Sequence, residues 1–98
     1  MLNFLKDCGI SDDVIKDLEY TYSPENIYNL DSNEFEVIKI IEYFRKIGIE
    51  YIDELLVHNL EVFLCKFSYI VDKFNKYKID DVVKMINDDY MLIDNIIF

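Results

Sequence analysis

The sequence predicts an all-α protein, a small single domain of about six to eight short and medium helices stacked as helical hairpins. Three observations lead to this prediction. Apolar residues recur at spacings of three and four over long stretches, helix-capping residues precede those stretches, and no segment alternates apolar and polar residues as a half-buried strand would. With 98 residues, 52% of them hydrophobic, the chain is expected to form one domain over residues 1–98.

Two short helices are expected in the N-terminal part, and a serine precedes each of them. Ser11 stands before a segment over residues 12–21 whose apolar residues share one face, namely Val14, Ile15 and Leu18. Ser23 is followed by Pro24, and proline is well suited to the first position of a helix because its missing N–H would have no partner there. Both serines are therefore predicted to be N-caps.

The clearest single helix is expected over residues 33–47. Its apolar face is predicted from spacings of three and four and consists of Phe35, Ile38, Ile41 and Phe44, with Ile40 and Ile47 as further candidates. Asp31 or Ser32 is expected to cap its start, since Asp31 and Glu34 have the spacing of a capping box. Gly48 follows at a position where helices often end in a left-handed residue.

The C-terminal part is expected to hold one long helix and two shorter ones. The long helix is predicted over residues 60–76, with an apolar face of Leu60, Phe63 or Leu64, Phe67, Ile70, Val71 and Phe74. A shorter helix is predicted to start at Asp80 and to carry Val82, Val83, Met85 and Ile86. The last helix is marked by Leu92, Ile93, Ile96 and Ile97.

An internal repeat is visible when the chain is aligned with itself. Residues 43–68 align without gaps with residues 73–98, and Phe44, Lys46 and Ile49 match Phe74, Lys76 and Ile79 in identity. A looser copy lies in a divergent N-terminal unit, residues 1–37, where Gly9 corresponds to Gly48. The alternative is that any helical hairpin with the same capping residues would look alike. In either case each hairpin must stack on its neighbour to bury its apolar face.

At the level of pattern, this unit resembles the helical repeats of the mitochondrial transcription terminator family. The likeness is carried by Lys46-Ile47-Gly48-Ile49 with Leu55 and Leu56, and by Lys76-Tyr77-Lys78-Ile79 with Met85 and Ile86. Asn59 and Asp89 stand where that family favours proline, and its basic surface is absent. The resemblance implies helix–turn–helix units, and no function is carried over from it.

Negative charge is concentrated at the N-terminal end. The net charge is −10, and residues 1–37 contribute −7 of it, with two lysines against nine acids. Such a field repels phosphate backbones and anionic membranes, while it attracts basic partners at rates that fall with salt. We therefore expect a protein partner with a basic surface, and we expect nucleic acid to be disfavoured.

Groups that could support catalysis are few. The chain has one histidine, His58, while Cys8 and Cys65 lack the short spacing of a zinc or redox motif, and two glycines are too few for most phosphate-binding loops. We expect no enzyme, no cofactor and no metal site. The cysteines are expected to act as small buried apolar residues in a reducing compartment. Since the N-terminus lacks a basic leader region and no apolar run approaches membrane-span length, a cytoplasmic protein is expected.

Tyrosines accompany the acids in the N-terminal unit, where three of them surround Ser23-Pro24. Tyrosine is favoured at interfaces because it offers a large rigid contact with a polar tip, although it also occurs at the core boundary between small helices. The sequence therefore predicts a non-enzymatic protein-interaction module that binds, and through binding inhibits, a basic or nucleic-acid-handling partner. The predicted binding residues are Asp12, Asp13, Asp17, Glu19, Tyr20, Tyr22, Glu25 and Tyr28.

Two other functions are consistent with the sequence. A lysine run over residues 73–78, in which Phe74 and Tyr77 are interleaved, is typical of a helical-repeat protein that contacts nucleic acid. Lysines also favour the C-terminal end of a helix, which is where this run is expected to lie. The apolar stretch over residues 92–98 could instead join two copies of the chain in a homodimer.

Overall fold

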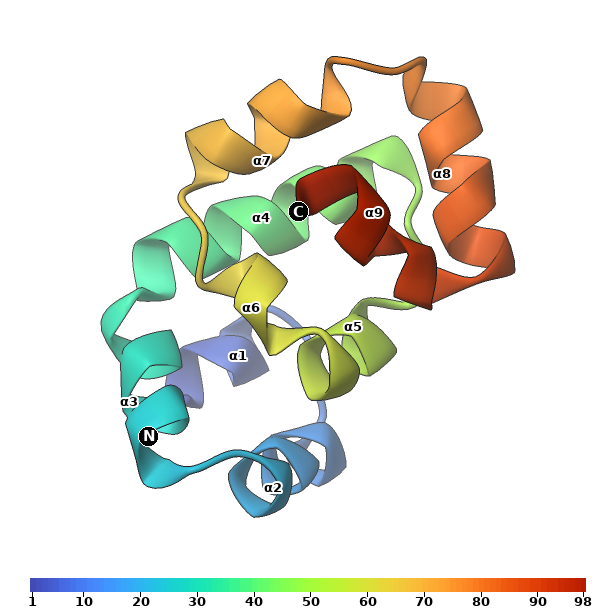
Figure 1. The fold of residues 1–98 in the computed structure, drawn as a ribbon. Coiled ribbons are helices and arrows are strands. Elements are labelled where there is room, and N and C mark those ends of the chain that lie inside the picture. The colour runs from blue at the N-terminus through green and yellow to red at the C-terminus, as the bar shows by residue number, and fades with distance from the viewer.

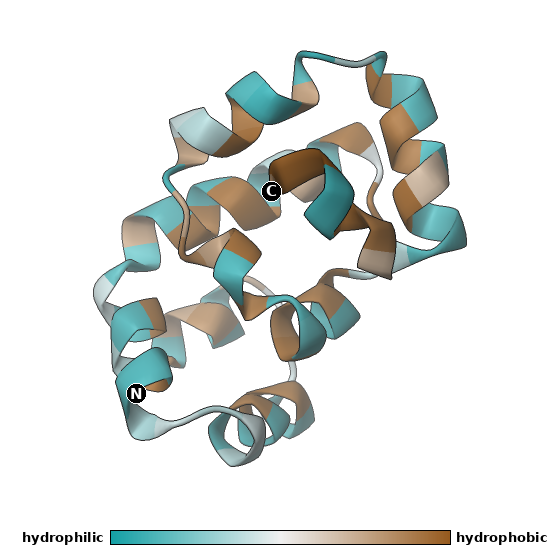
Figure 2. Ribbon diagram, viewed as in Figure 1, coloured by the Kyte–Doolittle hydropathy of each residue, from teal (hydrophilic) through white to brown (hydrophobic).

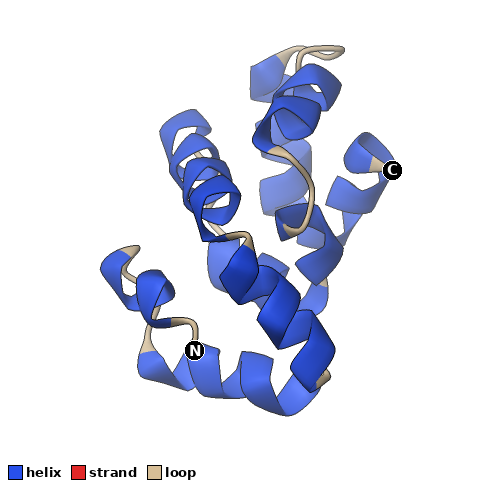
Figure 3. Cartoon of the chain, turned by 90° about the vertical axis from the view of Figure 1, so that its left-hand side faces the viewer, coloured by secondary structure: helices blue, strands red, loops and turns tan.

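The computed structural model describes all residues, 1–98, and shows helices joined by short turns without any strand, which confirms the predicted all-α fold (Figures 1 and 3). The α-helices number nine, one above the predicted range, and a single short 3-10 helix, η1, accompanies them. In chain order they are α1 (Asn3–Asp7), α2 (Asp12–Thr21), α3 (Pro24–Ser32), α4 (Glu34–Ile47), α5 (Ile52–His58), α6 (Leu60–Phe63), α7 (Phe67–Phe74), α8 (Ile79–Asp88), η1 (Tyr90–Leu92) and α9 (Ile93–Ile97).

The two predicted serine caps are confirmed. The Ser11 hydroxyl oxygen accepts the backbone N–H of Val14 at 3.3 Å, and that of Ser23 accepts the N–H of Asn26 at 3.3 Å. Pro24 is the first residue of α3, as expected for a residue without an N–H. Local capping chemistry therefore decides where α2 and α3 begin.

The predicted apolar face of α4 was wrong at its first residue. Phe35 is 76% exposed, while the buried residues of α4 are Val37, Ile40, Ile41 and Phe44. The prediction joined Phe35, Ile38, Ile41 and Phe44 in steps of three residues. Because a helix turns about 100° per residue, each such step drifts by roughly 60°, so the first and last residues of that series point to opposite sides.

The predicted cap of α4 was also wrong. Asp31 and Ser32 both belong to α3, and Asn33, which directly precedes α4, makes no side-chain capping bond. The Asp31 carboxylate instead accepts the backbone N–H of Leu2 at 2.8 Å, so it fixes the N-terminus against α3. This contact spans 29 residues of sequence, which is why local spacing could not predict it.

Gly48 ends α4 in the left-handed conformation, as predicted, with φ of 100°. Gly9 has the same role after α1, with φ of 82°, and each glycine is followed by a buried isoleucine, Ile10 or Ile49, whose N–H bonds back to the helix. The equivalent of Gly48 in the predicted second repeat is Lys78. Its φ is −71°, so it is not left-handed, and it directly precedes α8. The repeat itself stays a prediction.

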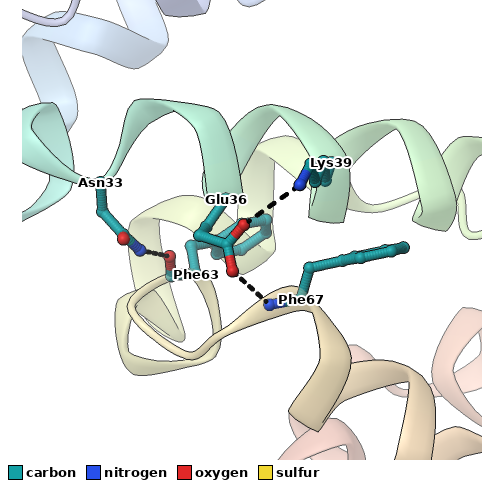
Figure 4. A network of polar contacts seen from close by, with 5 residues as sticks. All are labelled: Asn33, Glu36, Lys39, Phe63 and Phe67. Carbon is teal, nitrogen blue, oxygen red and sulfur yellow. Dashed lines mark hydrogen bonds and ion pairs between the residues drawn. The ribbon is translucent and has the colours of Figure 1, made fainter.

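The predicted long helix over residues 60–76 is two helices, α6 and α7, separated by a turn in which Lys66 is extended. Side chains of α4 and of Asn33 hold this break (Figure 4). The Glu36 carboxylate accepts the backbone N–H of Phe67 at 3.2 Å, and the Asn33 amide donates to the carbonyl of Phe63 at 3.3 Å. Since apolar residues lie at helical spacing on both sides of the turn, periodicity alone did not show it.

Glu36 therefore acts as a cap supplied from another helix, and its removal should destabilise the protein. We expect Glu36→Ala to lower the free energy of unfolding by about 1 kcal/mol, a typical cost of losing an N-terminal cap. Lys39 forms an ion pair with Glu36 at 3.6 Å, but its side chain is 58% exposed, so Lys39→Ala should change stability by less than about 0.5 kcal/mol. Urea unfolding monitored by circular dichroism measures both, and equal losses would contradict the capping role.

One hydrophobic cluster of 26 buried residues forms the core. At its centre lie three fully buried phenylalanines, with the ring of Phe44 stacked on Phe74 at 5.6 Å and edge-on to Phe63 at 5.8 Å between centroids. The C-terminal segment fills the space beside them: α9 packs against α7, and η1 packs against α5 and α8 (Figure 1). Apolar residues dominate this last segment in Figure 2. None of the helices combines the length and the apolar character needed to cross a membrane.

Candidate partner-binding surface

The predicted binding residues lie on two consecutive helices that pack against each other at one end of the molecule, except for Tyr22, which lies in the turn between them (Figure 1). We call the exposed side of α2 and α3 the α2–α3 surface. It comprises seven of the eight predicted residues, all of them exposed: Asp12, Asp13, Asp17, Glu19, Tyr20, Glu25 and Tyr28. The structure therefore brings most of the predicted set onto one pair of helices.

An outward stripe runs along each of these helices. Asp13, Asp17 and Tyr20 follow one another at spacings of four and three on the side of α2 opposite its buried residues. On α3, Glu25 and Tyr28 hold the equivalent position. Tyr20 is 93% exposed and Tyr28 is 59% exposed, so both rings are available for contact. Their exposure is unusual for large aromatic side chains and is the kind of surface that interfaces use.

Tyr22 differs from the other predicted residues because the fold already uses it. Its side chain is half-buried between α2 and α3, and its hydroxyl donates a 2.5 Å hydrogen bond to the carbonyl of Val57 in α5. Burial raises the pKa of this phenol, against an opposing contribution from the backbone of Leu60, and the Glu61 carboxylate raises it further. The phenol therefore stays protonated and keeps donating at neutral pH.

Most acids of the α2–α3 surface form no ion pair, although the exposed Lys16 of α2 lies among them. The whole chain has 20 acids but only two ion pairs, Lys6 with Asp12 at 3.2 Å and Lys39 with Glu36 at 3.6 Å. Asp12 is therefore partly compensated. The carboxylates without an ion-pair partner on this surface are Asp13, Asp17, Glu19 and Glu25. A surface with such an excess of acids projects a negative field into solvent.

Sequence reasoning missed a small cleft at the edge of this surface. It has a volume of about 240 Å³ and lies where the N-terminus meets the turn between α2 and α3; its walls are Met1, Glu19, Tyr22, Pro24 and Ile27. Glu19 and Tyr22 were in the predicted set, while the other three were not. Met1 reaches this place because Leu2 is bonded to Asp31, a long-range contact without a sequence signal.

The two alternative functions depend on the lysine run over residues 73–78 and on the C-terminal stretch over residues 92–98. In the lysine run, Phe74 is fully buried, so Tyr77 is the exposed aromatic between the lysines. The Lys73 ammonium lies 5.3 Å from the centre of the Tyr69 ring. In the C-terminal stretch the isoleucines are buried within the chain, and Phe98 is 65% exposed. A larger hollow of about 420 Å³ beside α7 is lined by Cys65, Lys66, Ser68, Tyr69, Asp72 and Phe98, with one charge of each sign.

Chemically reactive groups are dispersed. No three side chains of histidine, cysteine, aspartate or glutamate lie close enough together to hold a metal ion. Cys8 and Cys65 are partly buried against the core, and burial raises the pKa of both thiols, which disfavours the nucleophilic thiolate. His58 is exposed at the end of α5 and stacks on Tyr90 at 6.0 Å between ring centres. No protein-family model, curated protein or solved structure matches the chain.

Proposed function

We propose that this chain is a non-enzymatic interaction module of the cytoplasm, and that its α2–α3 surface binds a basic face of a partner protein. The observation that supports this most directly is the juxtaposition, on two packed helices, of four acids without ion-pair partners and two strongly exposed tyrosines. The acids attract and orient a basic face, and the tyrosines supply contact area at low entropic cost. Where the basic face normally contacts nucleic acid, occupation of that face inhibits the partner.

The proposal predicts that neutralising the α2–α3 surface weakens binding far more than neutralising acids elsewhere. The test variant is Asp13→Asn/Asp17→Asn/Glu19→Gln/Glu25→Gln. The matched control is Asp53→Asn/Asp72→Asn/Asp81→Asn/Asp88→Asn, four exposed acids that likewise have no ion-pair partner. Each set removes four negative charges and changes the net charge from −10 to −6, so total charge is held equal.

We expect the immobilised wild-type chain and the control to capture basic proteins from an extract of the source cell. The test variant should bind the same proteins about tenfold more weakly, since each exposed charge pair contributes up to about 1 kcal/mol. Capture should also decline between about 0.1 M and 1 M salt, as the screening length shortens from roughly 10 to 3 Å. Equal losses for both variants, or capture that is independent of salt, would contradict the proposal.

Inhibition is tested on the captured partner. We expect the wild-type chain to compete with a labelled nucleic acid for that partner and the test variant to compete about tenfold less well. A partner that binds nucleic acid and the chain at the same time would remove the inhibitory part of the proposal. The alternative functions have their own tests, filter binding of nucleic acid at about 50 mM salt for the lysine run and sedimentation for the homodimer.

A further inference from the structure

The cleft at the edge of the α2–α3 surface combines apolar walls with one carboxylate. Pro24 and Ile27 of α3 and the Met1 side chain provide aliphatic walls, Tyr22 contributes an aromatic ring, and Glu19 contributes the charge. Its volume of about 240 Å³ lies below the range of roughly 300–1,000 Å³ that small-molecule sites occupy. A single long side chain of a partner is the kind of group that such a cleft accommodates.

The walls are held in place by bonds that do not depend on a partner. The Tyr22 hydroxyl is bonded to Val57 of α5, so its ring cannot swing out. Ser23 caps α3 and thereby sets the position of Pro24, and the bond from Leu2 to Asp31 anchors the segment that carries Met1. Because the cleft is ordered beforehand, binding there costs little conformational entropy.

The chemistry of the walls selects among basic side chains. Arginine and lysine both have an aliphatic stem that packs on apolar surface and a cationic head that pairs with a carboxylate. The guanidinium of arginine is planar, more weakly hydrated than an ammonium, and stacks on aromatic rings, so a cleft with a tyrosine wall favours arginine. We propose that the cleft of Met1, Glu19, Tyr22, Pro24 and Ile27 receives an arginine side chain of the basic partner, an inference that rests on the proposed function.

Two positive groups near the cleft act against a cation there, and the structure limits their effect. The dipole of α3 points its positive end toward the turn at Ser23, but Glu25 in the first turn of α3 offsets it. The N-terminal ammonium belongs to Met1, which is itself 66% exposed, so water screens this charge. Glu19 forms no ion pair within the chain, so its carboxylate is free to pair with an incoming arginine.

The test is a titration of the isotope-labelled chain, tagged only at its C-terminus, with capped pentapeptides followed by NMR. One peptide carries arginine between glycines, a second carries citrulline, which has the same shape without charge, and a third carries lysine. We expect saturable shifts confined to the amides of Glu19, Tyr22, Ile27 and their neighbours, with arginine binding in the millimolar range, lysine more weakly, and citrulline at least about threefold more weakly than arginine.

Two variants then test whether Glu19 supplies the carboxylate that pairs with the arginine. Glu19→Gln should weaken arginine-peptide binding by about three- to fivefold, whereas Asp13→Asn, on the same helix but about 9 Å away along its axis, should leave it unchanged. The inference is overturned by absent or non-saturating shifts up to about 10 mM peptide, or by equal effects of the two variants. Either result leaves the proposed function standing if the fourfold variant still loses the partner, so the two failures are distinguishable.

Discussion

Replacing Phe44 with alanine should lower the free energy of unfolding by about 3–5 kcal/mol, the largest loss that we expect from a single substitution in this chain. Phe44 is fully buried, and its ring contacts Phe63, Phe74 and Tyr43 with centroid distances between 5.6 and 6.3 Å. These rings come from α4, α6 and α7, so a cavity at this position removes contacts among three elements at once. Urea unfolding monitored by circular dichroism measures the effect.

Phe35 is a matched control on the same helix. Phe35→Ala deletes the same atoms from α4 but at a position that is 76% exposed, so we expect a change within about 0.5 kcal/mol. If Phe44→Ala does not fold, Phe44→Leu, which leaves a smaller cavity, should lose roughly 1–2 kcal/mol. Comparable losses at positions 35 and 44 would show that the buried face of α4 had been assigned wrongly.

The second large effect is expected at Asp94, although this residue is exposed. Its carboxylate accepts a 3.1 Å hydrogen bond from the side-chain amide of Asn59, which is only 1% exposed. The side-chain oxygen of Asn59 has no hydrogen-bond partner, so the bond to Asp94 is the only hydrogen bond that this buried side-chain amide makes. Asp94→Ala leaves the amide without any partner and should cost about 1–3 kcal/mol.

Two further substitutions separate the hydrogen bond from the charge. Asp94→Asn keeps an oxygen that accepts from Asn59 and should recover most of the lost stability. Asp88→Ala removes an exposed acid that has no ion pair or side-chain hydrogen bond, and it should change stability by less than about 0.5 kcal/mol. If Asp94→Ala proves as mild as Asp88→Ala in thermal or urea unfolding, then the buried amide finds another partner and the assignment fails.

Some features of the fold could be predicted from local sequence, while others required the folded chain. Ser11, Ser23 and Gly48 have the predicted conformations because caps and left-handed helix ends act within a few residues of one another. Asp31 and the break at Lys66 were mispredicted because each depends on hydrogen bonds between segments about 30 residues apart, which helical periodicity does not encode. Phe35 was mispredicted for a different reason, because successive steps of three residues drift around the helix and place it opposite Phe44.

The candidate site likewise combines features that the sequence predicts with features that depend on the fold. The acidic and aromatic composition of α2 and α3 is a property of the sequence, and helical spacing already places Asp13, Asp17 and Tyr20 on one outward stripe. The half-buried position of Tyr22 depends on its bond to Val57, 35 residues away. The cleft beside it depends further on the docking of the N-terminus against α3 through Asp31.

By itself, therefore, the sequence determined the helical class, the capped starts of α2 and α3, the glycine ends and the concentration of negative charge in the N-terminal unit. These are consequences of side-chain chemistry within one turn or one helix. The tertiary structure alone decided where residues 60–76 divide and which acids remain without a partner. It also formed the cleft, because such features arise only when distant segments are brought into contact by burial of the common core.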